Sequence, residues 1–213
     1  HSEEMRALPT PRPEQSDKRR RILDAAIQVF AARGFYNARV SDIAREAGVA
    51  DGTIYLYFKN KDDLLISLFE DRMDEVLRIF REEIGTAGTA AHRLRRFIEV
   101  HLRLVSEEPT LAEVLTVELR QSAKFMREYR APKFAEFLQL LEDILEEGRG
   151  SGEFHAKVDP RVLRLVIFGA LDEVSMQWVQ ARGRRPFGLQ EAADQIWSTC
   201  AGGILTQPDN GGG

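Results

Sequence analysis

Apolar residues recur every three or four positions along most of this chain, the spacing that places them on one face of an α-helix. The first such stripe lies in a helix predicted from Asp17 to Gly34 and consists of Ile22, Ala26, Val29 and Phe30. The sequence shows no alternating pattern typical of strands, no internal repeat and no heptads. The pattern predicts an all-α fold of about nine helices.

The middle of the chain carries longer stripes separated by short breaks. A helix that opens at Asp62 presents Leu65, Phe69, Val76, Leu77, Phe80 and Ile84. After a loop at 85–88, the next helix breaks at Pro109 and presents Leu94, Phe97, Ile98, His101 and Val105. Two further helices carry Val114, Val117 and Leu119, and, from Pro132, Phe134, Phe137, Leu138, Leu141 and Leu145. These stripes predict a second, larger helical core.

The last two predicted helices are unusually apolar. Asp159 and Pro160 form a cap and a first-turn proline for a helix that is apolar on nearly all sides from Val162 to Val179. A final helix, Leu189 to Leu205, has a broad face of Ala193, Ile196, Trp197, Cys200, Ala201 and Ile204. This pair predicts a homodimer interface formed by the last two helices of each chain. A monomer whose last helices complete its own core is the alternative.

The segment from Val40 to Leu65 reads as two short amphipathic helices joined at Gly48. Ser41 is predicted to cap the first helix, and Gly48 suits the left-handed backbone at its end. Asp51 or Gly52 begins the second helix, in which Ile54 and Phe58 share the inward face. This is the plan of a helix-turn-helix, whose second helix enters the major groove of DNA.

Hydroxyl, phenol and amine groups remain on the outer side of this second helix. Such groups reach phosphate oxygens or base edges, and lysine attracts DNA of any sequence. The predicted DNA-binding residues are Ser41, Asp51, Gly52, Thr53, Tyr55, Leu56, Tyr57, Lys59 and Lys61. Among them, Thr53 and Tyr55 are the candidates for contacts to base edges. A surface helix with ordinary tyrosines is the alternative.

The string A-G-V-A-D-G-T-I-Y-L-Y-F-K-N-K-D-D-L-L resembles the signature of the TetR family of bacterial one-component repressors. The resemblance covers about residues 18–70. It is specific, because the turn, the recognition helix and the following lysine all fall in register. It implies a DNA-binding head, a helical core that binds an effector, and a dimer built on a four-helix bundle. It also implies that Tyr57 and Lys61 contact phosphates.

Within that family, the chain looks most like the fatty-acid-degradation regulators of the FadR type. The similarity extends to L-I-S-L-F after the head, to V-E-L-R-Q-S at Val117–Ser122 and to I-F-G-A-L-D-E at Ile167–Glu173. The resemblance implies a repressor of fatty-acid metabolism genes that long-chain acyl-CoA releases from a palindromic operator. Alternatives are a regulator of efflux or another pathway that responds to a different apolar molecule, and an architectural DNA binder without an effector.

Charge is distributed unevenly along the 213 residues. The whole chain carries −4, yet residues 16–62 hold nine Lys or Arg against six Asp or Glu, so that this part carries +3 and the rest −7. A basic head on an acidic body is typical of a sequence-specific regulator. The basic run Lys18–Arg21 alone is also compatible with an ordinary solvated helix start.

Composition narrows the remaining possibilities. With 43% hydrophobic residues and no long apolar run, the chain is expected to be a globular protein that does not enter a membrane. One cysteine fits a reducing compartment, which favours the cytoplasm. A DNA-binding regulator there is expected to associate with the nucleoid. Four scattered histidines, no metal-ligand spacing and no phosphate-binding glycine loop argue against an enzyme, a metal site or a cofactor.

The effector is expected in the middle of the chain, where aromatic and basic residues alternate. An apolar cavity would take an acyl tail, and cations at its mouth would take the phosphates of coenzyme A. The expected ligand-binding residues are His101, Arg120, Phe125, Arg127, Tyr129, Phe137, Phe168 and Trp178, with Lys124, Arg130, Lys133, Phe134 and Leu138 nearby. Ordinary core packing for the aromatic residues and a solvated basic face for the cations are the alternatives. Asp172 or Glu173, in an apolar helix, is expected to pair with an arginine such as Arg120.

These observations predict four parts. Residues 1–15 hold three prolines and are expected to be disordered or the remnant of a tag. Residues 16–62 are the predicted DNA-binding domain, and residues 63–207 are the predicted ligand-binding and dimerisation domain. Residues 208–213 are expected to form a disordered tail.

Overall fold

A computed structural model describes residues 13–85, 88–181 and 183–206 of the chain. Within these ranges, ten α-helices and one short 3₁₀ helix account for nearly all of the regular structure. The all-α prediction is therefore confirmed. The predicted disorder of residues 1–15 is wrong for residues 13–15, which belong to a helix, and for the rest of that segment and for residues 208–213 it falls outside the described residues.

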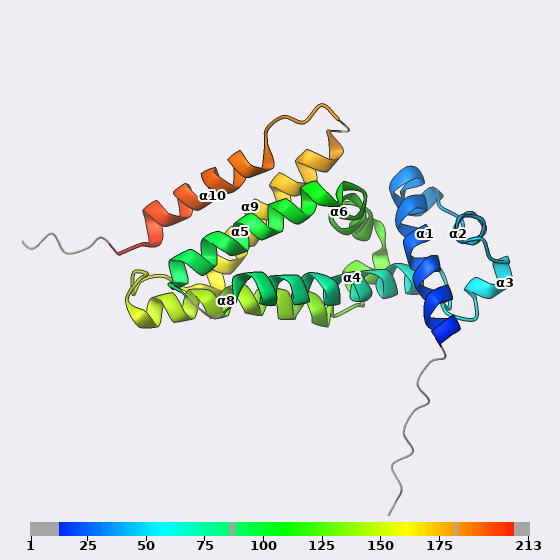
Figure 1. The fold of residues 1–213 in the computed structure, drawn as a ribbon, viewed down its shortest axis with the longest axis horizontal. Helices are drawn as coiled ribbons and strands as arrows, with labels where there is room; N and C mark the ends of the chain where they lie inside the picture. Colours follow the sequence, from blue (N-terminus) through cyan, green and yellow to red (C-terminus); the bar gives the residue numbers. More distant parts are fainter. Residues whose placement is uncertain (1–12, 86–87, 182, 207–213) are drawn as a thin grey trace, which may run out of the picture. The chain divides into compact units, whose positions relative to one another are not determined.

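The chain divides into two compact units between Leu68 and Phe69, six residues beyond the boundary expected from the sequence. The first unit consists of α1 (Pro13–Asn37), α2 (Val40–Ala47), α3 (Asp51–Ile54) and the first residues of α4 (Lys61–Ile84) (Figure 1). The helix α1 begins four residues earlier than predicted, because proline suits the first position of a helix. Gly34 has φ of 75° and ψ of 154°, which are not helical angles, so the regular helix ends there as predicted, and a further short helical stretch follows this kink up to Asn37.

A continuous apolar core holds the first unit together. The helix α1 packs against α2, and α2 packs against α3. Their inward side chains are almost completely removed from solvent, as are the first apolar residues of α4. This core comprises Ile22, Leu23, Ala26, Phe30, Ile43, Ala44, Ile54, Phe58, Leu64 and Leu65. The three-helix head therefore presents a fixed outer surface.

The second unit contains the rest of α4 and the remaining helices. These are α5 (Ala90–Glu107), α6 (Pro109–Thr116), η1 (Glu118–Gln121), α7 (Ala123–Arg127), α8 (Pro132–Ser151), α9 (Pro160–Gln180) and α10 (Leu189–Ile204). Helix α5 lies between α8 and α10, and both α6 and α8 pack against α9 (Figure 1). The short elements η1 and α7 raise the number of helices in the described residues above the predicted nine.

Local signals in the sequence explain several helix starts. Pro109, Pro132 and Pro160 each occupy the first turn of a helix. The carboxylate of Asp159 accepts a hydrogen bond from the backbone N–H of Arg161 at 3.0 Å, which confirms the predicted cap of α9. The hydrogen bond from the Arg161 side chain is the main reason why the pKa of Asp159 falls to about 2.

The loop after α8 ties three helix ends together. The carboxylate of Glu153 accepts hydrogen bonds from the backbone N–H groups of Ala90 and Ala91, at 3.1 and 3.0 Å, and so caps α5. The backbone carbonyl of Glu153 accepts from the N–H of Thr206 at 3.0 Å, beyond the end of α10. An antiparallel bridge between Phe154 and Leu205 completes this junction.

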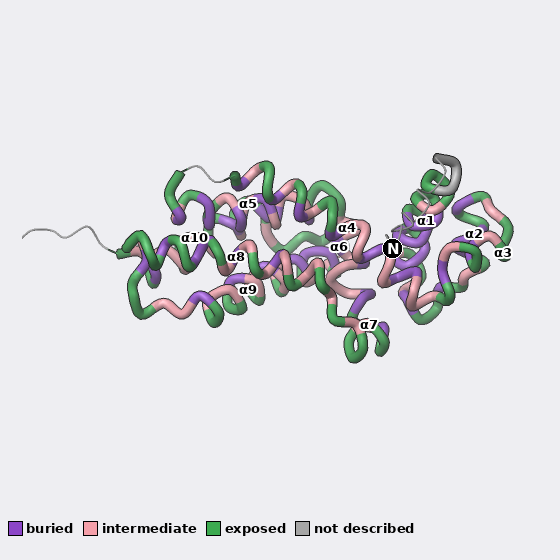
Figure 2. The backbone as a smooth tube through the Cα atoms, turned by 90° about the horizontal axis from the view of Figure 1, so that it is seen from below, coloured by how far each residue is buried: buried purple, intermediate pink, exposed green. Residues whose placement is uncertain are grey.

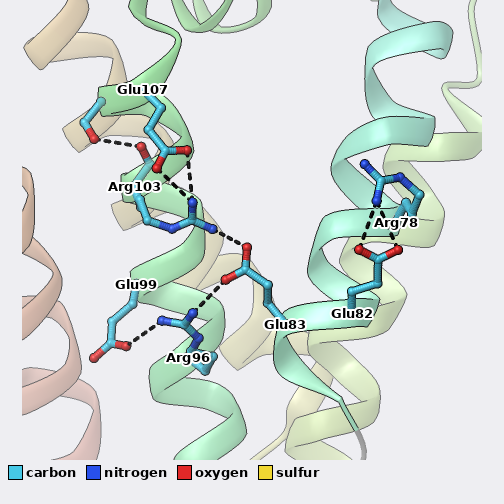
Figure 3. Close-up of polar contacts among 8 residues, drawn as sticks. Arg78, Glu82, Glu83, Arg96, Glu99, Arg103 and Glu107 are labelled. Atoms are coloured by element: carbon cyan, nitrogen blue, oxygen red, sulfur yellow. Dashed lines mark hydrogen bonds and ion pairs between the residues drawn. The ribbon is translucent and has the colours of Figure 1, made fainter.

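Ion pairs join the C-terminal part of α4 to α5. The carboxylate of Glu83 accepts from Arg96 at 2.6 Å and also from Arg103 (Figure 3). Arg103 donates in addition to Glu107, at 2.9 Å. This network bridges two helices, whereas the pair of Arg78 and Glu82 lies within α4 alone (Figure 3).

Helix α9 is less covered than its composition led us to expect. The sequence predicted burial on two faces, but parts of α9 are exposed within one chain (Figure 2). The exposed large apolar residues of this helix are Val162, Leu165 and Val166. Leu165 and Val166 follow Val162 by three and four positions, so the three residues share one face of the helix. No helix in the described part of the chain is both long and apolar enough to cross a membrane.

Candidate DNA-binding surface and ligand cavity

A left-handed glycine forms the turn between α2 and α3. Gly48 has φ of 64° and ψ of 41°, and its N–H donates to the carbonyl of Arg45 at 3.2 Å. This confirms the predicted helix end, and α3 begins at Asp51 as expected. The predicted cap is wrong: α2 starts at Val40, so Ser41 is an exposed residue inside the helix, because Asp42 satisfies the free N–H of Arg39 instead.

Asp42 fixes the start of α2 to α1. Its carboxylate accepts from Arg33 at 2.8 Å, from Arg45 at 2.6 Å and from the backbone N–H of Arg39 at 3.3 Å. Burial alone would raise the pKa of Asp42, but these three donors together lower it. The other end of α2 is held by Arg21, which donates to the carbonyl of Ala47 at 2.6 Å.

The outer surface of α3 and the turn after it combines hydroxyl, phenol and apolar groups. Helix α3 ends at Ile54, and a turn continues through Tyr57 to Phe58, whose N–H donates to the carbonyl of Ile54 at 3.0 Å. Ile54 and Phe58 are buried as predicted. Leu56 and Tyr55 are 81% and 58% exposed. Exposed apolar side chains of this size do not stabilise the fold, and neighbouring ones are typical of a surface that binds another molecule. Other exposed or half-exposed groups here are Asp51, Gly52, Thr53, Tyr57 and Lys59.

Lys61 stabilises the head through hydrogen bonds that the sequence did not reveal. Its ammonium group donates to the backbone carbonyls of Phe35 at 2.6 Å, Ala38 at 3.0 Å and Tyr36 at 3.2 Å, and lies 4.5 Å from the centre of the Phe35 ring. Burial lowers the pKa of Lys61, and the nearby Asp62 opposes this effect. An ammonium group has three donors, so a phosphate contact would have to replace one of these bonds.

The second unit encloses an apolar cavity of about 150 Å³. Helices α4, α5, α6, α8 and α9 all contribute side chains to it. Its apolar lining residues are Phe69, Met73, Val76, Ile79, Phe80, Leu104, Val105, Leu111, Ala112, Leu115, Phe134, Phe137 and Phe168. An apolar cavity with few polar groups is the usual form of a small-molecule site.

The charged side chains of the lining are largely neutralised. Arg72 pairs with Glu75 at 3.3 Å, and Asp172 pairs with Arg120 at 2.5 Å. The second pair confirms the expected partner of Asp172. Glu75 and Glu108 are exposed and lie where the cavity meets solvent. The lining therefore offers mainly aliphatic and aromatic surface, and its two half-buried charged side chains, Arg72 and Asp172, each have an ion-pair partner.

His101 is a polar side chain of this lining that lies among aromatic rings. Its ring contacts those of Phe80, Phe137 and Phe168, and its Nε2 lies 3.4 Å from Oγ of Ser175. Burial lowers the pKa of His101 to about 4, against the opposing charge of Asp172. The imidazole is therefore neutral at physiological pH.

Comparison with known proteins identifies both units. Residues 22–68 match the bacterial regulatory proteins of the tetR family, and residues 69–203 match the C-terminal region of YsiA-like proteins. The chain belongs to the TetR family. It is 44% identical over 158 residues to the fatty acid metabolism regulator protein of Bacillus subtilis, a match that covers 74% of this chain and 81% of that protein. The family assignment makes this chain a helix-turn-helix regulator of transcription and not an enzyme.

Two solved structures of TetR-family regulators are similar along most of their length. FadR from Bacillus subtilis, solved in complex with stearoyl-CoA, has a TM-score of 0.80 and 39% identity, covering 87% of this chain and 98% of that one. The fatty acid degradation regulator FadR from Bacillus halodurans has a TM-score of 0.82 and 37% identity, covering 92% and 98%. Both similarities extend well beyond the DNA-binding head.

The ligand residues expected from the sequence fall into two groups in this TetR-family chain. His101, Phe134, Phe137 and Phe168 line the cavity. Phe125 and Tyr129 lie behind its Phe69 end, with ring centres 5.1 and 6.4 Å from that of Phe69. Arg120 reaches the lining through Asp172. Trp178 and Leu138 do not line it, and Trp178 is instead covered by the guanidinium group of Arg185, 3.9 Å from its ring centre.

The basic residues near the cavity differ in their partners. Lys133 pairs with Asp74 at 2.7 Å and Arg120 with Asp172, so both serve the packing of helices. Lys124, Arg127 and Arg130 are exposed on α7 and the turn after it, and form no ion pair with other described residues. Most arginines of this unit pair with a carboxylate. These three side chains differ, because no ion pair with another described residue neutralises their positive charge beside the Phe69 end of the cavity.

Sequence reasoning missed the contribution of α4 and α6. Seven of the lining residues come from α4, between Phe69 and Phe80, and four from α6. The stripe on α4 was visible, but a stripe looks the same whether it faces packed side chains or a cavity. Only the positions of the facing helices distinguish the two.

Proposed function

We propose that this TetR-family chain is a repressor of fatty-acid metabolism genes that long-chain acyl-CoA releases from a palindromic operator. The observation that carries the proposal is the apolar cavity of the second unit, in a chain similar to regulators of this pathway. One of those relatives was solved with stearoyl-CoA bound. The protein would act in the cytoplasm, at the nucleoid.

The DNA-reading surface would be the outer side of α3 and its following turn. Thr53 and Tyr55 are proposed to contact base edges, and Leu56 to contact thymine methyl groups or sugars. Tyr57 and Lys59 are proposed to contact phosphates, with Ser41, Asp51 and Gly52 at the margin. Lys61 would support this surface by fixing the chain around Phe35 and would add long-range attraction through its charge.

The acyl tail would occupy the cavity, and the coenzyme A phosphates would lie on α7. The cavity is lined by α4 over twelve residues, from Phe69 to Phe80, a span of about 16 Å at the rise of an α-helix. Such an elongated apolar space suits an extended chain. Lys124, Arg127 and Arg130 supply free positive charge beside the Phe69 end, where an anionic headgroup would emerge.

A second copy of the chain would cover the exposed faces of α9 and α10. Val162, Leu165 and Val166 form an aliphatic stripe on α9. In the C-terminal half of α10 the exposed positions are small or short, at Ser198, Thr199, Gly202 and Gly203, whereas the exposed positions nearer its start are Gln190, Glu191, Asp194 and Gln195. Small residues allow close approach of helices, so the two pairs would form a four-helix bundle. A symmetric dimer of this kind reads two half-sites about 34–36 Å apart.

The switch would act through α4. This helix is continuous from Lys61, which fastens the head, to residues that line the cavity. A ligand that displaces Phe69, Met73 or Val76 would therefore shift the element that begins in the head. In the dimer, that shift would change the spacing of the two recognition helices.

The alternative of a regulator that senses a cationic drug has less support. Carboxylates do line the cavity, which would favour a cation. However, arginines neutralise Glu75 and Asp172, and Glu108 lies at the exposed edge. A cationic ligand would therefore find no unpaired buried carboxylate in the described lining.

A mobility-shift titration tests the proposal. The purified protein selects its operator from a random DNA pool, and stearoyl-CoA, free coenzyme A and stearate are then added in parallel. We expect stearoyl-CoA to release the operator at concentrations at which neither part alone does so. Lack of release by any long-chain acyl-CoA would contradict the assignment.

A set of charge variants tests the headgroup position. Replacing Lys124, Arg127 and Arg130 by Gln should weaken acyl-CoA binding about tenfold or more, because charge-assisted bonds to phosphate are lost, and should leave operator affinity intact. The control replaces Lys157 and Arg184, two exposed cations of the same unit that form no ion pair with described residues. Equal effects of both sets would rule out a headgroup site on α7.

A further inference from the structure

Three phenylalanine rings close one end of the cavity. The ring centres of Phe80, Phe97 and Phe137 lie 4.8, 5.0 and 5.1 Å apart, within the range of favourable aromatic pairs. They come from α4, α5 and α8, so each helix contributes one ring. Phe80 and Phe137 line the cavity, whereas Phe97 lies behind them and is completely buried.

Beyond these rings the second unit is closely packed. The residues one turn further along α4 and α8 are Ile84 and Leu141, and both are buried without lining the cavity. On α5, the lining begins at His101, one turn after Phe97. The cavity therefore ends at this layer, and nothing among the described residues continues it past Phe97.

The opposite end has a different character. Phe69 lines it, and the half-exposed rings of Phe125 and Tyr129 lie behind Phe69. The exposed cations Lys124, Arg127 and Arg130 are within two positions of these rings in the sequence. An amphiphilic ligand with an anionic head would place its head at this end. Its apolar tail would then point along α4 towards Phe80.

We propose that the Phe80–Phe97–Phe137 cluster is a floor that limits the length of the acyl chain, with Phe97 as the residue that determines the limit. The inference rests on the proposed function, because it assumes an acyl ligand. Phe97 is the determining residue because it supports Phe80 and Phe137 from behind without touching the cavity. Removing its ring gives both lining rings room to move and extends the cavity by one layer.

The test measures the affinity of a series of saturated acyl-CoA thioesters, differing by two carbons, by titration calorimetry. For the wild-type protein, affinity should rise roughly fourfold per methylene until the tail reaches the floor, and then stop rising. In Phe97→Ala the plateau should begin about two carbons later, so that the longest thioesters gain about tenfold relative to wild type. Phe97→Leu should shift the plateau in the same direction by a smaller amount. Because leucine fills more of the core than alanine, this variant can replace Phe97→Ala if the alanine variant does not fold.

Two controls separate the floor from general loosening of the core. Phe154 is another completely buried phenylalanine of this unit that does not line the cavity, so Phe154→Leu should leave the length profile unchanged. Phe125→Leu changes the opposite end and should weaken all thioesters alike. A shift of the plateau by Phe125→Leu and not by the Phe97 variants would show that the tail points the other way and would overturn the proposal.

A structure of the wild-type complex gives an independent reading that no variant can disturb. With stearoyl-CoA bound, the terminal methyl group should touch Phe80 and Phe137. A methyl group located elsewhere contradicts the floor. Binding of every length with an unchanged profile in both Phe97 variants contradicts the floor alone, whereas no binding of any thioester to wild type contradicts the proposed function as well.

Discussion

Two lysines, Lys59 and Lys61, stand only two positions apart but have different surroundings. The side chain of Lys59 is exposed, whereas Lys61 donates to three backbone carbonyls within the head. The sequence predicted DNA contacts for both, because type and spacing reveal charge and not hydrogen-bond partners. The structure separates a group that is free to meet phosphate from one that is already bonded.

This difference predicts opposite outcomes for two alanine variants. Lys59→Ala should leave the melting temperature unchanged, weaken all DNA sequences similarly and reduce the salt dependence of binding by about one ion. Lys61→Ala should destabilise the head by about 2 kcal/mol, since charged hydrogen bonds to three carbonyls are lost. Melting curves and DNA titrations at several salt concentrations measure both. An unchanged melting temperature in Lys61→Ala would refute the structural part assigned to this residue.

His101 makes stability depend on pH. Its pKa is about 4 in the folded chain and 6.5 as the ordinary value, so the unfolded chain binds the proton first as pH falls. The free energy of unfolding is therefore unaffected by His101 above pH 6.5 and decreases as pH falls towards 4. At pH 5 the decrease is about 2 kcal/mol. The free energy of unfolding, measured in urea, should differ between pH 7 and pH 5 by about 2 kcal/mol less in His101→Gln than in the wild-type protein. The exposed His92 is the matched control, and His92→Gln should keep the full difference.

At the scale of helices, the sequence predicted long elements well and short ones poorly. The long helices predicted at α4, α5, α8, α9 and α10 and the boundaries predicted at Pro109, Pro132 and Pro160 matched the structure, although α9 is less buried than expected. The segment 117–131 did not, because its η1 and α7 are too short for a periodic pattern. The capping residue of α2 was also misassigned, since Ser41 and Asp42 are both good caps and only the hydrogen bonds distinguish them.

Gly148 in α8 shows how one close approach determines helix packing. A Cβ atom placed there would lie 2.3 Å from the buried ring of Phe154, whereas one placed at Gly150 in the same helix would meet nothing within 4 Å. Gly148→Ala should therefore destabilise the second unit by about 1–3 kcal/mol through overpacking. Gly150→Ala should be neutral or stabilise it by up to about 1 kcal/mol, since alanine favours the helix. Chemical denaturation of both variants measures the contrast, and equal stabilities would disprove the packing argument.

At the scale of the whole molecule, the exposed stripe of α9 predicts a dimer. Leu165 is 57% exposed in one chain, as is Met126 on α7, so the two residues are matched in exposure but differ in position. Leu165→Asp should convert the dimer to a monomer, because it would place a charge in an apolar interface, and should weaken operator binding by an order of magnitude or more. Met126→Asp should leave the dimer intact. Sedimentation velocity reports the outcome, and a Leu165→Asp protein that remains dimeric would place the interface elsewhere.

The division of the molecule into a DNA-binding head and a ligand-binding core was predictable, because each part has its own charge and its own stripes. The position of the cavity was only partly predictable. His101, Phe137 and Phe168 were expected there, but the wall from α4 and α6 became apparent only once five helices were placed around it. A cavity depends on how several helices are spaced, and the apolar pattern of one helix does not specify that spacing.

The central claim is that acyl-CoA and operator DNA oppose one another through this chain. The most direct test measures the affinity for operator with and without saturating stearoyl-CoA, and the affinity for stearoyl-CoA with and without saturating operator. The account predicts that each ligand weakens the other by the same factor, between about 5-fold and 150-fold. Stearoyl-CoA that binds tightly and leaves the affinity for operator unchanged would contradict it.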